Sequence, residues 1–292
     1  MAEVAQIQET KIMQFPAKPL SDQYIGIFSE KGIAKRYNKK FKWRPDLLRH
    51  LTEVDILSPV IHGKFLDCSV GTGRLIPYLK RVTEFHAADT SAEFIAYVQK
   101  QYPFVQVKPG DLRKPLEYPN EMFDSVMSMR TLFAIGPIRN TIAEMDRICK
   151  PGGNIIFDYP NVPLSKRIEA TEEEVNYDMS ALGKYQESPD AILNSMSNIT
   201  YEKIPLDLFL HTIKSNLKKA RRRAYRKRKD LLSPLAWWRL SLYYLMYWAC
   251  CFIPASLMVR YERLSHRYPA LSLKAKDKRN CKRYLYICTK QA

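Results

Sequence analysis

The most informative part of this chain of 292 residues is LDCSVGTGR, Leu66 to Arg74. It ends a short apolar run, KFLDC, with an acid and then places glycines at Gly71 and Gly73. Glycine lets the backbone turn tightly and lets a ligand approach it closely. The apolar run predicts a strand, and RLIPYLKR after the turn predicts a helix whose free N–H groups face that turn. Alone, this pattern fits either a nucleotide-binding loop or a plain tight turn.

Short apolar runs alternate with helical stretches on both sides of this turn. The predicted strands, in chain order, are KFLDC, EFHAAD, FVQVKPGD, FDSVMSM, NIIFDY, ITYEKIPL and KRYLYICT. Helical spacing of apolar residues is found in RPDLLRHLTEVDI, RLIPYLKR, SAEFIAYVQKQY and IRNTIAEMDRICK, and PGG predicts a sharp turn before NIIFDY. Strands that alternate with helices in this way predict an α/β fold, with a parallel sheet covered on both faces.

Further acids and glycines follow the ends of the predicted strands. Asp89 ends the second strand, about 20 residues after the first acid, where a carboxylate can accept hydrogen bonds from both hydroxyls of a ribose. Asp111 follows the third strand, where a side chain can meet an adenine amino group, and KPGG leads into the fifth. Each acid alone could simply cap a helix. A nicotinamide-binding Rossmann domain would also explain Asp89, but the pattern GxGxxG is absent.

As a set, these residues resemble the class I S-adenosylmethionine-dependent methyltransferases. The resemblance is to the large group with LDxGxGxGR, an acid after the second strand, GD after the third and KPGG before the fifth. It covers roughly residues 30–160, with weaker likeness at 190–207 and 283–290. It implies a Rossmann-like, seven-stranded, mostly parallel sheet with helices on both faces, and S-adenosyl-L-methionine as cofactor with S-adenosyl-L-homocysteine as product. Two departures are Ser69, in place of the first motif glycine, and RTLFAIG, which lacks the His often found after the fourth strand.

The resemblance also implies the residues that surround the cofactor. Matching positions give a loop around the methionine part, an acid and its neighbour at the ribose, two residues beside the adenine, two residues after the fourth strand and an aromatic on a closing helix: Asp67, Ser69, Gly71, Gly73, Asp89, Thr90, Asp111, Leu112, Met129, Arg130 and Tyr37. Methyl transfer mainly needs a nucleophile held in line with the sulfonium. We therefore expect no metal site, and Tyr159 and His211 are only weak candidates for a base.

Positive charge is concentrated at one end of the chain. Residues 208–292 hold 21 Lys and Arg and 3 Asp and Glu, a net charge of +18, whereas residues 1–207 hold 26 and 27, a net charge of −1. Nine of these positive charges lie in residues 218–229, shortly before an uncharged run of 20 residues, 240–259. Such a run could just cross a bilayer, but one crossing would separate the last strand from the sheet, and Pro254 interrupts the run.

The composition instead favours docking in the plane of a membrane, or a re-entrant hairpin. Trp and Tyr prefer the headgroup boundary, and Lys and Arg are attracted to anionic lipid. The predicted membrane-docking residues are Lys218, Lys219, Arg221, Arg222, Arg223, Arg226, Lys227, Arg228, Lys229, Trp237, Trp238, Tyr243, Tyr244, Tyr247 and Trp248. The six cysteines form no CxxC pair or zinc-ligand pattern, and the N-terminus has no secretory signal. We therefore expect a cytoplasmic protein, peripheral at the cytoplasmic face of a membrane.

These patterns predict the organisation of the whole chain. Residues 1–43 are an N-terminal arm with a helix that closes over the cofactor, and residues 44–207 the S-adenosylmethionine-binding Rossmann-like domain. Residues 208–275 are a basic and aromatic helical insertion between the sixth and seventh strands, for membrane docking or as a substrate cap, and residues 276–292 the final strand, which returns to the sheet.

The predicted function is methyl transfer from S-adenosylmethionine to a lipid or lipid-linked acceptor at an anionic membrane surface. Two alternatives stay open. The basic insertion could bind a polyanion in an RNA- or protein-directed methyltransferase. The apolar run could instead be the interface of a homo-oligomer in a soluble methyltransferase of small molecules.

Overall fold

The computed structural model describes residues 26–40, 44–135, 138–161, 188–206 and 283–291, and the single positions 238, 241, 242, 245, 257, 260 and 264. Residues 1–25 of the predicted N-terminal arm, His211 and all predicted docking residues except Trp238 lie outside these residues. The predicted domain boundaries stay predictions for the same reason.

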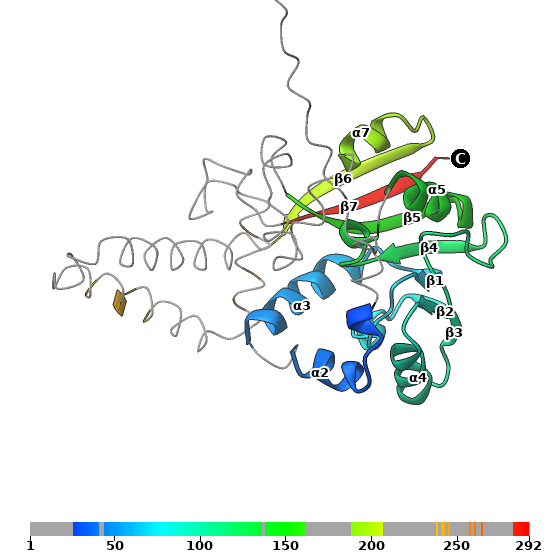
Figure 1. Cartoon of the computed structure of the whole chain (residues 1–292). Helices are drawn as coiled ribbons and strands as arrows, with labels where there is room; N and C mark the ends of the chain where they lie inside the picture. Colours follow the sequence, from blue (N-terminus) through cyan, green and yellow to red (C-terminus); the bar gives the residue numbers. More distant parts are fainter. Residues whose placement is uncertain are drawn as a thin grey trace, which may run out of the picture.

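The described residues form an α/β fold, as the alternation of strands and helices predicts (Figure 1). The elements, in chain order, are α2 (Ile33–Lys40), α3 (Arg44–Leu57), β1 (Gly63–Asp67), the 3-10 helix η1 (Ile76–Tyr78), β2 (Val82–Asp89), α4 (Ala92–Gln101), β3 (Gln106–Pro109), β4 (Phe123–Ser128), the 3-10 helix η2 (Leu132–Ala134), α5 (Ile138–Ile148), β5 (Cys149–Pro160), α7 (Pro189–Asn194), β6 (Ile199–Leu206) and β7 (Arg283–Lys290). All seven predicted strands are present.

The strands form one mixed sheet in the order β3-β2-β1-β4-β5-β7-β6. β7 is antiparallel to both of its neighbours, whereas β3, β2, β1, β4 and β5 are parallel. Arg283, which begins β7, pairs with Pro160 at the end of β5 and with Leu206 at the end of β6. The chain therefore leaves the sheet after Leu206 and returns to it at Arg283 beside the carboxyl ends of the parallel strands.

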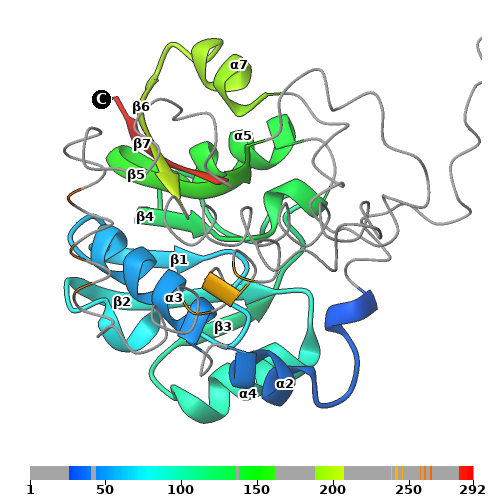
Figure 2. The same ribbon diagram turned by 90° about the vertical axis from the view of Figure 1, so that its left-hand side faces the viewer.

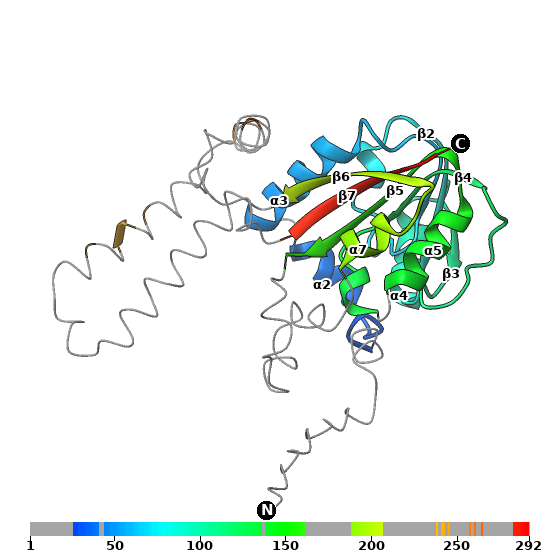
Figure 3. The same ribbon diagram turned by 90° about the horizontal axis from the view of Figure 1, so that it is seen from above.

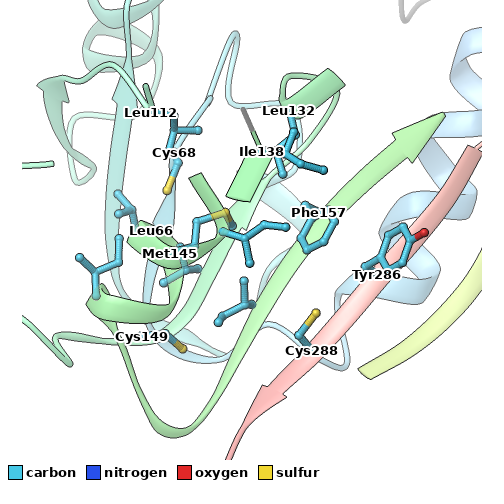
Figure 4. Close-up of a cluster of buried hydrophobic side chains, with 14 of the residues drawn as sticks. Leu66, Cys68, Leu112, Leu132, Ile138, Met145, Cys149, Phe157, Tyr286 and Cys288 are labelled. Carbon is cyan, nitrogen blue, oxygen red and sulfur yellow. The ribbon is translucent and has the colours of Figure 1, made fainter. Parts of the chain in front are cut away.

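The sheet has a hydrophobic core on each face, because neighbouring strand residues point in opposite directions. Leu66 and Val126 pack in a cluster with residues of α5 and α7, and Phe65 and Met127 pack in another with the end of α3. All four are at most 1% exposed. Figure 3 shows α3 on one side of the sheet and α5 and α7 on the other, and Figure 4 shows the first of these clusters.

The helix predicted directly after the glycine turn is wrong. RLIPYLKR forms only the single 3-10 turn η1. Pro77 lacks the N–H that an α-helix would need at that position, and its ring disfavours helical geometry in the residue before it. The glycine turn after β1 is therefore followed by a single 3-10 turn and not by a regular α-helix.

The turn predicted at PGG is also placed differently. β5 begins at Cys149, so KPGG lies inside the strand and not before it. The register with β4 shifts between Phe123 and Ser125, which pair with Cys149 and Asn154. Residues 150–153 therefore form an irregularity in β5, and Gly152 has the left-handed φ of +77° there.

Candidate functional site

A cavity of about 630 Å³, counting its open mouth, lies where the parallel strands end. Nine of the eleven predicted cofactor residues line it: Tyr37, Ser69, Gly71, Asp89, Thr90, Asp111, Leu112, Met129 and Arg130. Six further lining residues were not predicted: Phe28, Cys68, Phe94, Gly110, Thr131 and Ile135.

Asp89, at the end of β2, joins two parts of the cavity wall. One carboxylate oxygen accepts a hydrogen bond from the amide of Gly71, and the other accepts one from the amide of Ser91, both at 2.9 Å. Ser91 in turn caps α4, where its hydroxyl accepts a hydrogen bond from the amide of Phe94. Burial raises the pKa of Asp89, against the effect of its backbone donors. The carboxylate thus shapes the loop and also faces the cavity.

The other two predicted cofactor residues, Asp67 and Gly73, are not among the residues that line the cavity. The Asp67 carboxylate accepts a hydrogen bond of 3.2 Å from the amide of Ser69, and only 8% of the residue is exposed. Burial raises the pKa of Asp67 to about 7 and the negative charge of Asp89 adds to this, although the Ser69 amide and Arg74 act against it. Gly73, with φ +66°, lies so close to Ile76 and Tyr102 that a side chain would collide with them.

Ser69, which replaces a family glycine, has a partner of its own. Its hydroxyl lies 3.0 Å from that of Ser128, the last residue of β4. Ser128 is fully buried, so this contact satisfies a polar group that would otherwise be costly. The hydroxyl that the substitution adds therefore links the ends of β1 and β4 beside the cavity.

Asp111, after β3, is held by a cation. Its carboxylate oxygens accept hydrogen bonds from the Arg113 guanidinium at 2.8–3.0 Å, and the Arg113 amide donates to it as well. Burial raises the pKa of Asp111, but these contacts with Arg113 outweigh it and keep the pKa below its usual value. Asp111 is therefore a carboxylate with a fixed orientation at the cavity wall.

An aromatic wall closes the other side of the cavity. The rings of Phe28, Tyr37 and Phe94 lie with their centroids 5.6–6.1 Å apart. Two hydrogen bonds fix the N-terminal segment to the α4 region: Ser91 Oγ donates to the Phe28 carbonyl at 2.6 Å, and Asn38 Nδ2 donates to the Tyr97 hydroxyl at 2.8 Å. Tyr37 of α2 therefore lines the cavity together with two other rings, and its role in closing over the cofactor stays a prediction.

Comparison with known proteins identifies the domain. The family model described as "Methyltransferase domain" matches residues 66–157. Over these residues the chain carries a class I S-adenosylmethionine-dependent methyltransferase domain. The fold and cofactor that the sequence predicts are thereby confirmed: methyltransferases of this class take their methyl group from S-adenosylmethionine.

Curated methyltransferases are among the relatives of this chain. A phosphatidylethanolamine N-methyltransferase of Cereibacter sphaeroides is 27% identical over 101 residues, which are 32% of this chain and 49% of that protein. A demethylmenaquinone methyltransferase of Paenarthrobacter aurescens is 29% identical over 143 residues, 47% of this chain and 55% of that protein. The chain thus spans about half the length of these two relatives.

A solved methyltransferase shares the fold. The structure of a Haemonchus contortus phosphoethanolamine N-methyltransferase 2 with S-adenosyl-L-methionine matches with a TM-score of 0.56 and 17% identity. The match covers 95% of this chain and 62% of that one. At this identity the likeness concerns the fold alone.

Neither of the two weak candidates for a base is placed at the cavity by the residues that the structure describes. Tyr159 is 1% exposed and packs in the core cluster under α5 and α7, outside the cavity lining. His211 lies outside the described residues. Over the residues that the structure describes, no three His, Cys, Asp or Glu side chains come together as metal ligands would. None of the described helices combines the length and apolar composition needed to span a membrane.

Proposed function

We propose that this protein transfers the methyl group of S-adenosylmethionine to a lipid or lipid-linked acceptor at a membrane surface. The observation that carries the methyl transfer is the shared cavity of Gly71, Asp89 and Asp111, which come from the ends of three neighbouring strands. Asp89 is the carboxylate for the ribose hydroxyls, Asp111 lies by the adenine, and the glycine loop surrounds the methionine part. A large share of the barrier can be removed by holding the acceptor in line with the sulfonium.

The lipid-related acceptor is supported by a relative and by exposed side chains. The relative from Cereibacter sphaeroides is a phosphatidylethanolamine N-methyltransferase, although it matches only a third of this chain. Trp238, Leu242 and Leu245 are helical and are 65%, 40% and 67% exposed. A spacing of four and three is that of residues on one face of a helix. Exposed apolar residues that share a face are typical of an interaction surface.

Charge supports an anionic membrane as the partner of this face. The sequence places nine Lys and Arg in residues 218–229, shortly before Trp238. Each such charge near an anionic bilayer is worth about 1 kcal/mol. An apolar face and a basic cluster together are two signals of the kind that stable peripheral binding requires.

Flotation tests the docking. The purified protein is mixed with phosphatidylcholine vesicles, with or without phosphatidylserine, and with or without competitor RNA. We expect it to float with the anionic vesicles and to remain bound when RNA is added. Protein that stays at the bottom, or that RNA removes, contradicts membrane docking and favours a nucleic-acid partner. A protein that is a dimer in solution and binds neither vesicles nor RNA would favour an oligomer interface.

Transfer of label tests the reaction. S-adenosylmethionine with a labelled methyl group is incubated with the protein and vesicles that contain phosphatidylethanolamine, and the lipid fraction is then extracted. We expect labelled lipid with the unchanged protein and much less with Asp89→Ala. Label found only in protein or RNA would contradict a lipid acceptor but leave methyl transfer in place.

A further inference from the structure

A buried cluster of ions lies under α3, next to the cavity. Glu53 of α3 lies 2.7 Å from Arg130, 2.6 Å from Arg74 and 3.3 Å from Arg283. Asp158 of β5 forms a second ion pair with Arg283. Glu53 is 1% exposed and Asp158 is fully buried. Of these five residues only Arg130, directly after β4, lines the cavity.

A buried cluster of ions is not needed to stabilise a core. Burial raises the pKa of Glu53, but Arg130, Arg74 and Arg283 outweigh it and hold the pKa well below its usual range, so Glu53 is an anion. Apolar residues of similar volume are often as stabilising as buried ion pairs, whereas removal of one partner leaves a costly buried charge. A buried cluster beside a cofactor cavity therefore points to a role other than stability.

Arg130 is the residue on which the two carboxylates converge. Its φ of 64° is left-handed, a conformation that is unfavourable for any residue with a Cβ atom. Asp158 accepts a hydrogen bond from the Arg130 backbone amide, and Glu53 accepts one from its guanidinium at 2.7 Å. The backbone and the side chain of Arg130 are thus each held by a buried carboxylate.

The conformation of Arg130 sets the direction of the chain along the cavity. Met129, Arg130 and Thr131 are consecutive, and all three line it. A change at Arg130 would therefore move the residues on both sides of it. In-line methyl transfer loses rate steeply with small misplacement of the reacting groups.

Arg283 holds the two carboxylates in place. Its guanidinium contacts both Asp158 and Glu53, which lie on β5 and α3. A planar guanidinium can bridge two carboxylates in this way, whereas the single ammonium of lysine is a point charge. Arg283 also begins β7, where residues 207–282 return to the sheet.

We propose that Glu53, Asp158 and Arg283 are positioning residues for methyl transfer, which hold Arg130 in its left-handed conformation and so fix the cavity wall of Met129 to Thr131 against the cofactor. None of the three lines the cavity, so they act through Arg130. This role rests on the proposed methyl transfer, but binding of the cofactor can test it without an acceptor.

The main experiment is calorimetry of S-adenosylmethionine binding to Asp158→Asn. We expect affinity to fall about tenfold, which corresponds to about 1.4 kcal/mol. The matched control is Asp124→Asn, because Asp124 also accepts a backbone hydrogen bond, from Lys64, and pairs with a cation, Lys150, each at 2.7 Å. Asp124 does not line the cavity, so this control should lower thermal stability and leave cofactor affinity unchanged.

A second substitution separates positioning from general stability. Glycine adopts the left-handed conformation freely, so in an Arg130→Gly background Asp158→Asn should weaken binding less than about threefold, a non-additive result for coupled residues. The proposal would be overturned if the loss of affinity in the double variant equalled the product of the losses in the two single variants. It would also be overturned if Asp158→Asn bound S-adenosylmethionine with normal affinity. If that variant does not fold, Arg283→Lys tests the same cluster, with weaker cofactor binding expected at a retained charge. Absence of binding by the unchanged protein would instead overturn the proposed function together with this role.

Discussion

A hydrogen bond of 2.9 Å joins the Gly71 amide to the carboxylate of Asp89. The first residue belongs to the loop after β1, and the second ends β2. The other oxygen of the same carboxylate accepts the amide of Ser91, at the start of α4. One side chain therefore braces two segments that meet at the cavity, and it also lines the cavity where we propose that the ribose of the cofactor binds. Loss of Asp89 should disturb the shape of the site and its chemistry together.

Asp89→Ala should weaken S-adenosylmethionine binding by about tenfold to a hundredfold. Hydrogen bonds to a charged group are each worth about 1.5–3 kcal/mol, and the substitution removes the braces of the loop as well. Calorimetry measures the affinity directly. Glu84→Ala, on the same strand but 41% exposed at its side chain, is the control and should bind normally. Equal affinity of both variants would contradict the assignment of Asp89 to the cofactor site.

Gly73→Ala should destabilise the protein more than Gly152→Ala does. Both glycines have left-handed φ angles, of +66° and +77°, so alanine is strained at either position. At Gly73 a Cβ would also lie 2.6 Å from Ile76 Cδ1 and 3.0 Å from the Tyr102 ring, whereas nothing lies within 4 Å at Gly152. We expect a loss of about 1 kcal/mol at Gly152 from the backbone alone and a larger loss at Gly73. Chemical denaturation gives both values, and equal losses would show that the loop relaxes around the added methyl group.

The strand ends that carry the site could be predicted from the sequence because parallel strands bring their carboxyl ends to one edge. Asp89 and Asp111 follow apolar runs that read as strands, so their meeting at one cavity was predictable. Of the three rings in the aromatic wall, only Tyr37 was predicted. Phe28 and Phe94 belong to no motif and reach the cavity through the packing of α2 on α4. Their helical segments give no sign of a ligand.

The ion cluster could not be predicted, because its members are distant in the sequence. Glu53 and Arg283 are separated by 230 positions, and no local pattern links them. For Tyr159 the strand was predicted correctly, but the direction of the side chain was not. Neighbouring strand residues face opposite ways, so Asp158 points to the cluster under α3 while Tyr159 enters the core under α5 and α7. The helix predicted at RLIPYLKR was wrong because the prediction followed the helical spacing of its apolar residues and not the effect of Pro77.

Asp67→Asn should reduce the loss of stability that occurs as the pH rises from about 4 to 7. In the folded protein, burial raises the pKa of Asp67 from 3.8 to about 7, so between these values the folded state binds a proton that the unfolded state has released. Where the folded state binds more protons, the free energy of unfolding falls as the pH rises. Asparagine cannot ionise and removes this contribution. Thermal unfolding of both proteins between pH 4 and 8 measures the difference; parallel curves would mean that Asp67 is ionised in the fold at neutral pH.

Leu245→Asp should weaken binding to anionic vesicles without changing affinity for S-adenosylmethionine. Leu245 is helical and 67% exposed, and in the proposed docking a carboxylate there would have to enter the headgroup region beside anionic lipid. Phe104→Asp is the matched control, because Phe104 is 63% exposed and lies between α4 and β3 in the chain. Vesicle co-sedimentation measures the first property and calorimetry the second. If both variants bind vesicles as the unchanged protein does, the face of Trp238, Leu242 and Leu245 is not the docking surface. If Leu245→Asp instead turns a dimer into a monomer, that face is an interface between two copies of the chain.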